Sequence, residues 1–438
     1  DRTVFSITVM GAEIYVVTSP DDVLTVYKNT NTTVFDYNAQ IKDILGIFGF
    51  TSRTMNLLFD EEKFGGKSWM DLCHEKFKLQ MHPGEKLDEL QANLLSNLDH
   101  SLTFNLLSGD MIQPGSTEKE KVVSLYAWCS EVLVDAATKA FYGKALYEVA
   151  PNLLPEFLIF DDEAWKLYSK YPEFAAKKMF RYKAKVQSAF ERYVDLPKEQ
   201  RQDASWLIKN IEESLVELDV TETSQLAPNL FLLHRLLNTN AYKQCFWCLA
   251  YLLHDQQLLQ AVKAEIQPAF QADGQLNLDY LLDNGPLINS LYEENLRLCN
   301  APIGARQVMS KFALGGKVLK TGNMLLMPYR QLHFNEQVFG TNATEFDAKR
   351  FLKDKNLLRS TSYRPFGGGS TYCPGRFLAK REVLMFVALV LFRFDISLVG
   401  KDGEKAKFPR MDVTIPLGGV MGPVVGDDII MEVRPVKS

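Results

Sequence analysis

The chain has 438 residues, of which 46% are hydrophobic and 24% charged, the composition of an ordinary globular protein with a large core. Its net charge of −5 provides no bulk attraction for nucleic acid, and its six scattered cysteines do not form a disulfide framework, so we expect a reducing compartment. The longest apolar run, residues 383–392, falls short of the roughly 18 residues that a membrane helix needs and predicts a buried core helix.

The first residues predict a β-hairpin, because VFSITVMGAEIYVVTS is rich in β-forming residues on both sides of Gly11. The chain begins in this run without a starting methionine or a signal pattern, and we expect it to be a shortened form of a longer protein. A second hairpin is predicted at FALGGKVL, where Gly315 and Gly316 form a two-residue turn.

Most of the remaining chain has the apolar spacing that is typical of helices. This spacing predicts helices within residues 86–98, 121–141, 202–218 and 256–270. No internal repeat and no long linker divides the chain. We therefore expect one mainly α-helical domain with small β-sheets, covering residues 1–438.

One predicted helix is unusually long. Residues 224–255 contain no strong helix breaker after Pro228, which is tolerated in a first turn, and at about 1.5 Å per residue such a helix would span roughly 45 Å. Its centre, NTNAYK, is polar while both flanks are apolar. A polar centre in a buried helix costs free energy unless it is paired or lines a cavity. The pattern indicates either a hydrated kink or a helix that passes an active site.

Near the C-terminus the sequence FGGGSTYCPGRFLAKRE places Cys373 between a glycine-rich loop and a predicted helix. A helix N-terminus stabilises a thiolate, glycines allow the backbone to wrap closely around a flat cofactor, and Pro374 suits a first helical turn. The loop therefore suits a buried metal thiolate, although a small core cysteine is the plain alternative. Zinc and nucleophile sites lack nearby partner residues, and a phosphate loop lacks its Gly-Lys-Ser/Thr ending.

The pattern Phe-x-x-Gly-x-x-x-Cys-x-Gly, here Phe366, Gly369, Cys373 and Gly375, resembles the haem-binding signature of the cytochrome P450 family. The resemblance implies the fold of that family: a single triangular, mainly α domain with small β-sheets, holding haem b between the long helix and the cysteine loop. Cys373 would be the axial ligand of the iron.

Two further signatures follow the order of the family. Glu294-x-x-Arg297 places two charges on one helix face, and Arg350 stands where the family has the third member of a buried charge network. The family's usual prolines are replaced by Thr344 and Ala348. We expect the three charged residues to form a buried structural network.

The resemblance also implies further contacts to the haem. The residues expected to bind the cofactor, besides the cysteine, are Phe366, Gly367, Gly375, Arg306 and Arg376. The family's basic residue two positions before the cysteine is Thr371 here. A Trp-x-x-x-Arg pair of the family is incomplete, since Trp69 is followed by Cys73 and His74, and His74 is either a propionate donor or a surface histidine.

The sequences STYCPGR, PYRQLHFNEQVFG and CFW are similar to one clan of the family, which contains the sterol 7α- and 12α-hydroxylases, prostacyclin synthase and fungal biosynthetic enzymes. Most of the family carries an acid and a threonine on the long helix, and alignment on Phe246 and Trp247 places the catalytic positions at Asn240 and Ala241. Ala241 lacks the hydroxyl of that threonine, and two enzymatic functions therefore stay open: oxidation of a lipophilic natural product with dioxygen, or a redox-neutral rearrangement. A haem-thiolate sensor without turnover is the non-enzymatic alternative.

The same resemblance implies a class of substrate, an electron donor and a cellular location for the enzyme. We expect a lipophilic small-molecule substrate (a terpenoid, steroid, alkaloid or polyketide-like compound) and NADPH–cytochrome reductase as the electron donor. The native protein is expected to be a monomer anchored to the endoplasmic reticulum membrane on its cytosolic face, with no nucleic-acid partner. The residues expected to contact the substrate are Ala301, Pro302, Ile303, Leu417 and Val420.

Overall fold

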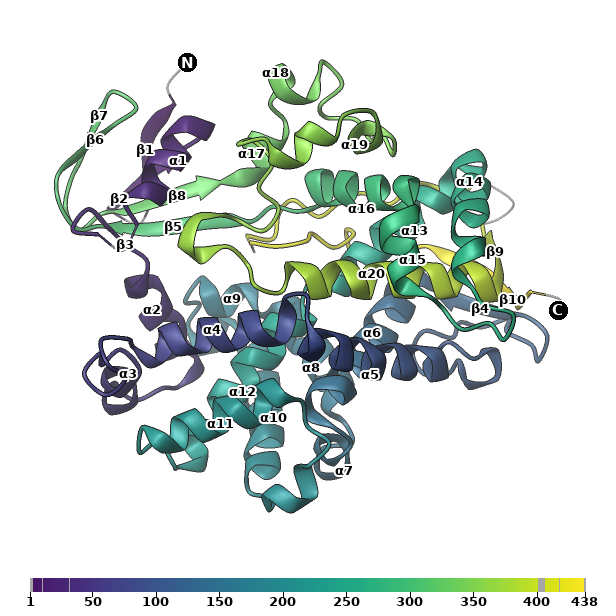
Figure 1. The fold of residues 1–438 in the computed structure, drawn as a ribbon, viewed down its shortest axis with the longest axis horizontal. Helices are drawn as coiled ribbons and strands as arrows, with labels where there is room; N and C mark the ends of the chain where they lie inside the picture. The colour runs from purple at the N-terminus through teal and green to yellow at the C-terminus, as the bar shows by residue number, and fades with distance from the viewer. Residues whose placement is uncertain (1–2, 10, 31, 401–405, 417, 437–438) are drawn as a thin grey trace. The chain divides into compact units, whose positions relative to one another are not determined.

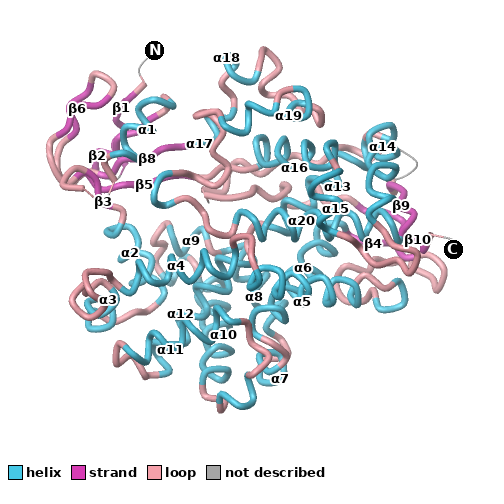
Figure 2. The backbone as a smooth tube through the Cα atoms, in the orientation of Figure 1, coloured by secondary structure: helices cyan, strands magenta, loops and turns pink. Residues whose placement is uncertain are grey.

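The computed structural model describes residues 3–9, 11–30, 32–400, 406–416 and 418–436. Helices dominate, and the described strands form sheets of five, three and two strands (Figures 1 and 2). The chain divides into two compact units. The first unit consists of Asp1–Leu45, Pro286–Cys373 and Val413–Met421, and the second of Gly46–Gly285, Pro374–Asp412 and Gly422–Ser438. Each unit is assembled from stretches far apart in the sequence.

The first unit contains the larger sheet. Its strands are β1 (Val4–Val9), β2 (Ala12–Val17), β3 (Phe35–Asp36), β5 (Ile303–Val308) and β8 (Met324–Pro328), with a separate hairpin of β6 (Phe312–Leu314) and β7 (Lys317–Leu319). The sheet order is β1-β2-β8-β5-β3, and only β2 and β8 are parallel. Both predicted hairpins are confirmed, and Gly315 and Gly316 have φ of +54° and +74°, as a type I′ turn requires.

The helices of the first unit surround this sheet and the cysteine loop. They are α1 (Pro20–Lys28), α16 (Pro286–Cys299), α17 (Tyr329–His333), α18 (Glu336–Phe339) and α19 (Arg350–Lys353), while α2 (Asn38–Phe48) extends across the boundary of the unit. Buried side chains of α1, β2 and β8 share one hydrophobic core that includes Tyr27, Phe35 and Tyr329.

The second unit is almost entirely helical. Its helices are α3 (Ser52–Leu58), α4 (Trp69–Met81), α5 (Glu85–Ser101), α6 (Leu125–Tyr142), α7 (Ala145–Val149), α8 (Leu153–Glu163), α9 (Trp165–Tyr168), α10 (Lys177–Val194), α11 (Trp206–Glu217), α12 (Thr223–Asn238), α13 (Ala241–His254), α14 (Gln256–Ile266), α15 (Leu278–Asn284) and α20 (Arg376–Arg393). Its sheet joins β4 (Lys121–Ser124), β10 (Ile430–Pro435) and β9 (Phe394–Leu398) in that order.

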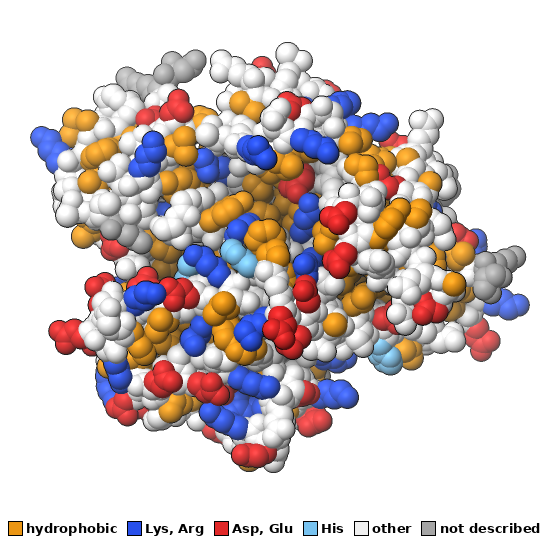
Figure 3. All heavy atoms as spheres, in the orientation of Figure 1, with side chains coloured by type: hydrophobic (Ala, Val, Ile, Leu, Met, Phe, Trp, Pro, Cys, Tyr) orange, Lys and Arg blue, Asp and Glu red, His pale blue; other side chains and the backbone are white. Residues whose placement is uncertain are grey.

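The apolar run at residues 383–392 lies in α20, whose residues from Glu382 to Leu391 are buried, as predicted for a core helix. None of the helices in the described residues combines the length and apolar character that crossing a membrane requires. The six cysteines all lie in the described residues and form no disulfide bond there. On the visible face of the described residues, basic and acidic side chains are interspersed rather than gathered by sign (Figure 3).

One helix prediction is wrong at its start. The helix expected within residues 121–141 begins only at Leu125, because Lys121–Ser124 forms β4 and pairs with β10. The run KVVS contains adjacent valines, which favour a strand. The side chain of Ser124 then accepts a hydrogen bond from the Ala127 N–H and caps the helix.

The long helix predicted for residues 224–255 is interrupted at Thr239 and Asn240, as the kink alternative requires, although both residues keep dihedral angles in the helical region. The side chains before the interruption bond to carbonyls four residues earlier. Asn238 Nδ2 donates to His234 O at 2.9 Å, and Thr239 Oγ1 lies 2.7 Å from Arg235 O. Such side-chain bonds compete with the helical backbone bonds. The polar centre of the sequence is therefore a break between α12 and α13.

A buried carboxylate on α8 stabilises this break. Asp161 is 1% exposed, and its oxygens lie 3.0 Å from Thr239 Oγ1 and 3.1 Å from the Tyr242 hydroxyl. Lys243 Nζ and an Arg235 nitrogen lie 3.4 and 3.5 Å from the same carboxylate. One anion thus receives hydroxyl and cationic donors from both sides of the break, which makes the interruption a defined part of the structure.

Replacing Asp161 with asparagine keeps the shape of the side chain but removes this anion. Since Lys243 and Arg235 stay buried without compensation, we predict that Asp161→Asn lowers the free energy of unfolding by about 3–5 kcal/mol. Denaturation by urea, followed by circular dichroism, measures the change. Asp283 on α15 of the same unit is exposed, and Asp283→Asn should change the value by no more than about 0.5 kcal/mol. Equal effects of the two substitutions would contradict a stabilising role for the cluster.

Candidate active site

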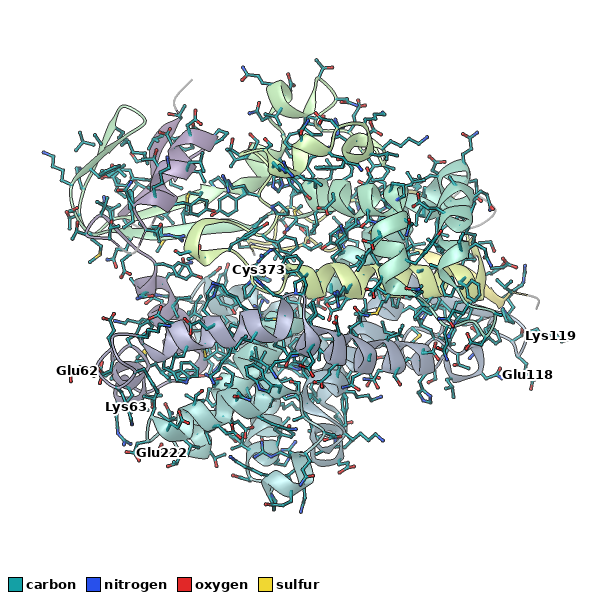
Figure 4. All side chains as sticks on the ribbon, viewed as in Figure 1. Glu62, Lys63, Glu118, Lys119, Glu222 and Cys373 are labelled. Carbon is teal, nitrogen blue, oxygen red and sulfur yellow. The ribbon has the colours of Figure 1, made fainter. Side chains whose placement is uncertain are left out.

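The loop from Phe366 to Cys373 folds back on itself within the first unit, just before α20 (Figure 4). The Cys373 N–H donates to Phe366 O at 3.1 Å, which closes the loop. Gly367 and Gly369 have φ of +77° and +63°, a region that favours glycine. A Cβ on Gly369 would also meet the ring of Tyr27 at 3.0 Å, so the loop has no room for a side chain there. Cys373 itself is half-buried.

The helix after the cysteine begins later than the sequence predicts. Gly375 is the N-cap of α20, with φ of −76°, so Pro374 precedes the helix and is not in its first turn. The φ of Gly375 is therefore one that any residue can adopt, so the backbone conformation does not require glycine here. Arg376, the first helical residue, lies 3.3 Å from His82 Nε2, and the imidazole packs on Phe377 with ring centres 5.0 Å apart. Arg376 is thus positioned by the C-cap residue of α4.

Arg306 on β5 is 2% exposed and points its guanidinium at neutral oxygens. Its Nε donates to the Thr30 hydroxyl at 3.0 Å, and its Nη2 donates to the Thr371 hydroxyl at 2.8 Å. The aromatic ring of Tyr37 lies 4.7 Å from the guanidinium carbon. Thr371, two residues before Cys373, therefore orients Arg306 instead of supplying a charge of its own.

Arg306 has no carboxylate partner within the described residues, and burial lowers the pKa of its guanidinium. Burial also raises the pKa of Tyr37, Arg306 opposes this shift and Cys373 adds to it, so the three groups are close enough to interact. Asp36 in part opposes the lowering of the Arg306 pKa, but the hydrogen-bond acceptors of the guanidinium are neutral, so part of its desolvation cost stays uncompensated. This arrangement fits an anionic group, such as a haem propionate, beside the cysteine loop.

Trp69, from the incomplete Trp-x-x-x-Arg pair, makes a structural contact within the second unit. The Trp69 indole is 2% exposed and donates to the Ser214 hydroxyl at 3.0 Å, which ties α4 to α11. His74 is half-buried, and this burial lowers the pKa of its imidazole. Trp69 thus already has a hydrogen-bond acceptor within its own unit.

The structure brings Glu294, Arg297 and Arg350 together in the interior of the first unit. The Glu294 and Arg297 side chains are 0% exposed and Arg350 is 7% exposed. Arg297 holds the carboxylate with two hydrogen bonds of 2.8 Å, and Arg350 Nε contributes contacts of 3.1 and 3.2 Å. The Asp347 N–H donates to the same carboxylate at 2.9 Å. The remaining guanidinium nitrogens donate to backbone carbonyls, including His333 O.

Removing the carboxylate of Glu294 would leave two buried guanidinium groups without an anion. We predict that Glu294→Ala costs about 3–5 kcal/mol of stability and that the protein fails to fold or to retain haem. Haem content per protein after purification, together with the denaturant midpoint, measures the loss. Glu336→Ala on α18 removes an exposed carboxylate from the same unit and is the matched control. A Glu294→Ala protein as stable as the control would show that the network is dispensable.

The residues predicted to contact substrate gather at the end of α16. Ala301 and Pro302 are half-buried, and Ile303 is 46% exposed at the start of β5. The Ala301 N–H donates to Gly419 O at 2.8 Å, which places the segment containing Val420 beside them. Val420 is 7% exposed. Leu417 lies outside the described residues.

The two positions that the sequence predicts to be catalytic lie at the break between α12 and α13. Asn240 is the N-cap of α13 and is exposed, while Ala241 is its first residue and is half-buried. Leu236 on the last turn of α12 is 59% exposed, although most of that helix is buried. The break therefore presents one apolar and one amide side chain on an accessible face of the second unit.

Comparisons with known proteins agree with this architecture. The sequence model of the family described as "Cytochrome P450" matches residues 243–421. Cytochrome P450 monooxygenase poxD of Penicillium oxalicum is 24% identical over 93% of this chain and 83% of its own length. Cholesterol 7-alpha-monooxygenase of Cricetulus griseus is 24% identical over 76% of this chain and 71% of its own length. The solved structure of retinoic acid-bound cyanobacterial CYP120A1 has a TM-score of 0.74 at 17% identity, covering 99% of this chain and 92% of that one.

The chain is similar in sequence to the cytochrome P450 family over residues 243–421 and has the cytochrome P450 fold. It is an oxidoreductase of the cytochrome P450 type, whose cofactor is a haem with a cysteine thiolate as axial ligand.

Three features of the site were not predicted from the sequence. They are the Thr30 and Thr371 hydroxyls around Arg306, the carboxylate of Asp161 at the helix break, and the buried carboxyl of Glu382 on α20. The threonines and Asp161 give no local signal, because their partners are distant in sequence. Glu382 stands next to the apolar run of residues 383–392, which is a weak indication of burial.

Proposed function

We propose that the protein is a haem-thiolate monooxygenase that oxidises a lipophilic small molecule with dioxygen and electrons from a reductase. The observation that carries this proposal is the hydrogen bond from Arg306 to Thr371. It places the buried guanidinium of β5, which has no salt-bridge partner in the described residues, against the loop that carries Cys373. A thiolate ligand and an anchor for a carboxylate, held by one loop, are what a haem with propionate groups requires.

In this proposal Cys373 binds the iron and Arg306 binds a propionate. Phe366 and Gly367 line the loop around the ligand, and Arg376 begins the helix that follows it. Haem bound through a thiolate supplies the activation of dioxygen, because the electron-rich sulfur favours cleavage of the O–O bond. The residues of the loop fix the position of the Cys373 sulfur, and its glycines leave no larger side chains beside it.

The overall reaction converts a substrate C–H bond to C–OH. One dioxygen, two electrons and two protons are consumed, and the second oxygen atom leaves as water. We assign the electrons to NADPH–cytochrome reductase. Asn240 and Ala241, at the accessible break, cannot ionise, so neither of them supplies a proton by itself.

The substrate class follows from the accessible side chains. Ile303, one of the residues that the sequence predicts to contact substrate, is a large apolar residue with an exposed side chain. Apolar walls with few polar anchors favour a lipophilic ligand. Relatives described as a fungal cytochrome P450 monooxygenase and as a cholesterol 7-alpha-monooxygenase support a terpenoid, steroid, alkaloid or polyketide-like substrate.

A second candidate function rests on Ala241. Since this position carries no hydroxyl, a redox-neutral rearrangement, which needs no proton delivery to dioxygen, is also compatible with the break. A haem-thiolate sensor would bind ligand without any turnover.

A single set of incubations separates the three functions. Compounds that shift the haem absorbance are first selected from terpenoid, steroid, alkaloid and polyketide panels. We predict an oxygenated product from a selected compound with reductase, NADPH and air, and no product without oxygen and electron donor. Product in the anaerobic tube would overturn the monooxygenase assignment in favour of a rearrangement. Binding without product in either tube would favour a sensor.

A further inference from the structure

Three consecutive carboxyl groups, Asp161, Asp162 and Glu163, lie in the last turn of α8 in the second unit. The hydroxyls and cations at the helix break hold Asp161. Glu163 pairs with Lys166 and, at 3.4 Å, with Lys178. The middle carboxyl, that of Asp162, is exposed and has no hydrogen bond or ion pair within the described residues. Its charge is therefore available to a ligand.

Asp162 is exposed, but protein from three other helices lies around it. Lys178 on α10 and Lys243 on α13 are close enough to interact with its charge. Burial raises the pKa of Tyr126 on α6 and of Tyr242 on α13, and the charge of Asp162 adds to both shifts. Burial also raises the pKa of Asp162 itself to about 6. A partly desolvated carboxylate attracts the charge of a ligand more strongly than a carboxylate in bulk water does.

The two neighbouring lysines are in contact with other carboxylates. Lys243 Nζ lies 3.4 Å from an Asp161 oxygen, and Lys178 Nζ lies 3.4 Å from a Glu163 oxygen. Neither ammonium group forms an ion pair with Asp162 within the described residues. A ligand with a positive charge would supply the partner that Asp162 lacks, whereas an anionic ligand would be repelled.

The ring of Tyr126 is a second feature that favours an organic cation. Tyr126 is half-buried, and its ring packs edge-to-face against the buried rings of Tyr242 and Phe246, with centres 5.6 and 5.4 Å away. The Tyr126 N–H donates to an Asp428 carboxylate oxygen at 3.0 Å, which fixes the start of α6. A partly accessible aromatic ring within reach of a carboxylate attracts an alkylammonium group through its π electrons.

These side chains lie at the break between α12 and α13. Tyr242 directly follows Ala241, one of the two positions that the sequence predicts to be catalytic. The Tyr126 hydroxyl also packs closely on the backbone at Gly422, where an added Cβ would lie 3.1 Å from it. Gly422 comes two residues after Val420, which the sequence predicts to contact substrate. A ligand at Asp162 and Tyr126 would therefore lie beside the accessible break.

We propose that Asp162 and the ring of Tyr126 bind a positively charged nitrogen of the substrate. The inference rests on the proposed monooxygenase function and narrows its substrate to a lipophilic amine that is protonated at neutral pH, the chemistry of an alkaloid. The carboxylate pairs with the ammonium group, the ring contacts its alkyl substituents, and the apolar remainder of the molecule lies along the accessible break. The contact is non-covalent, so it positions the substrate without taking part in its oxidation.

Calorimetric titration of the holoprotein with two probes of the same shape tests this site. Benzyltrimethylammonium carries a positive charge and cannot bind the haem iron, because its nitrogen has no lone pair. Neopentylbenzene is the uncharged counterpart, with carbon in place of the nitrogen. Asp162→Asn should weaken binding of the cation about tenfold and change binding of neopentylbenzene by less than about twofold.

Variants of Tyr126 separate its ring from its hydroxyl. Tyr126→Phe keeps the ring and should keep the affinity for benzyltrimethylammonium. Tyr126→Leu removes the ring and should weaken binding of the cation about threefold or more, with a smaller effect on neopentylbenzene. The absorbance of each reduced variant with carbon monoxide reports whether the haem site has remained intact.

The pH dependence of binding is a second readout. Because protonation removes the charge of Asp162, the affinity of the parent for the cation should fall as the pH drops through about 6, while that for neopentylbenzene stays constant. The titratable and charged groups that face Asp162 are Asp161, Glu163, Lys178, Lys243, Tyr126 and Tyr242. Since all of them remain in Asp162→Asn, loss of the pH dependence in that variant assigns it to Asp162.

The matched control is Asp283→Asn on α15, which removes an exposed carboxylate from the same unit and should leave both affinities as in the parent. If Asp162→Asn weakens the cation no more than Asp283→Asn does, or weakens both probes alike, the amine site is overturned and the monooxygenase function still stands. A preference for the cation that depends on Asp162, without oxygenated product from any amine with reductase, NADPH and air, would support the site and overturn the proposed function.

Discussion

An ionised group removed from water costs several kcal/mol unless opposite charge or a full set of hydrogen bonds compensates it. Glu294 satisfies this constraint with Arg297 and Arg350, and Asp161 satisfies it with Lys243 and Arg235. Arg306 satisfies it only in part within the described residues. The two paired sets stabilise the fold, whereas Arg306 marks where the cofactor would bind in the proposed function.

The break between α12 and α13 has a role in stability and a role in the proposed site. Asn238 and Thr239 use their side chains to bond to carbonyls that a continuous helix would use for its own N–H groups. The interruption exposes Asn240 and leaves a cavity beside Ala241. Asp161 on α8 contacts the Thr239 hydroxyl at the break. The interruption of the helix is therefore stabilised without a threonine at position 241.

The sequence predicts those parts of the structure that have a local signal. The two hairpins follow from β-forming residues around glycines, the core helix from an apolar run, and the cysteine loop and the Glu294 network from motifs with fixed spacing. The start of α6 was predicted wrongly, because pairing with β10 overrides local helical spacing. The break after Asn238 was expected only as one alternative, because its partner Asp161 is distant in sequence. The roles of Thr371 and Asp162 depend on partners, or the lack of them, that only the fold reveals.

The central claim is that Cys373 binds the haem iron as a thiolate, and the absorbance of the reduced protein with carbon monoxide tests it most directly. Thiolate ligation predicts a strongly red-shifted Soret band in the parent protein, and loss of that band in Cys373→Ala. The Cys299→Ala variant, which removes a buried cysteine of the same unit, should keep it. A histidine-type Soret band in the parent, or a red-shifted band that survives in Cys373→Ala, would contradict the account.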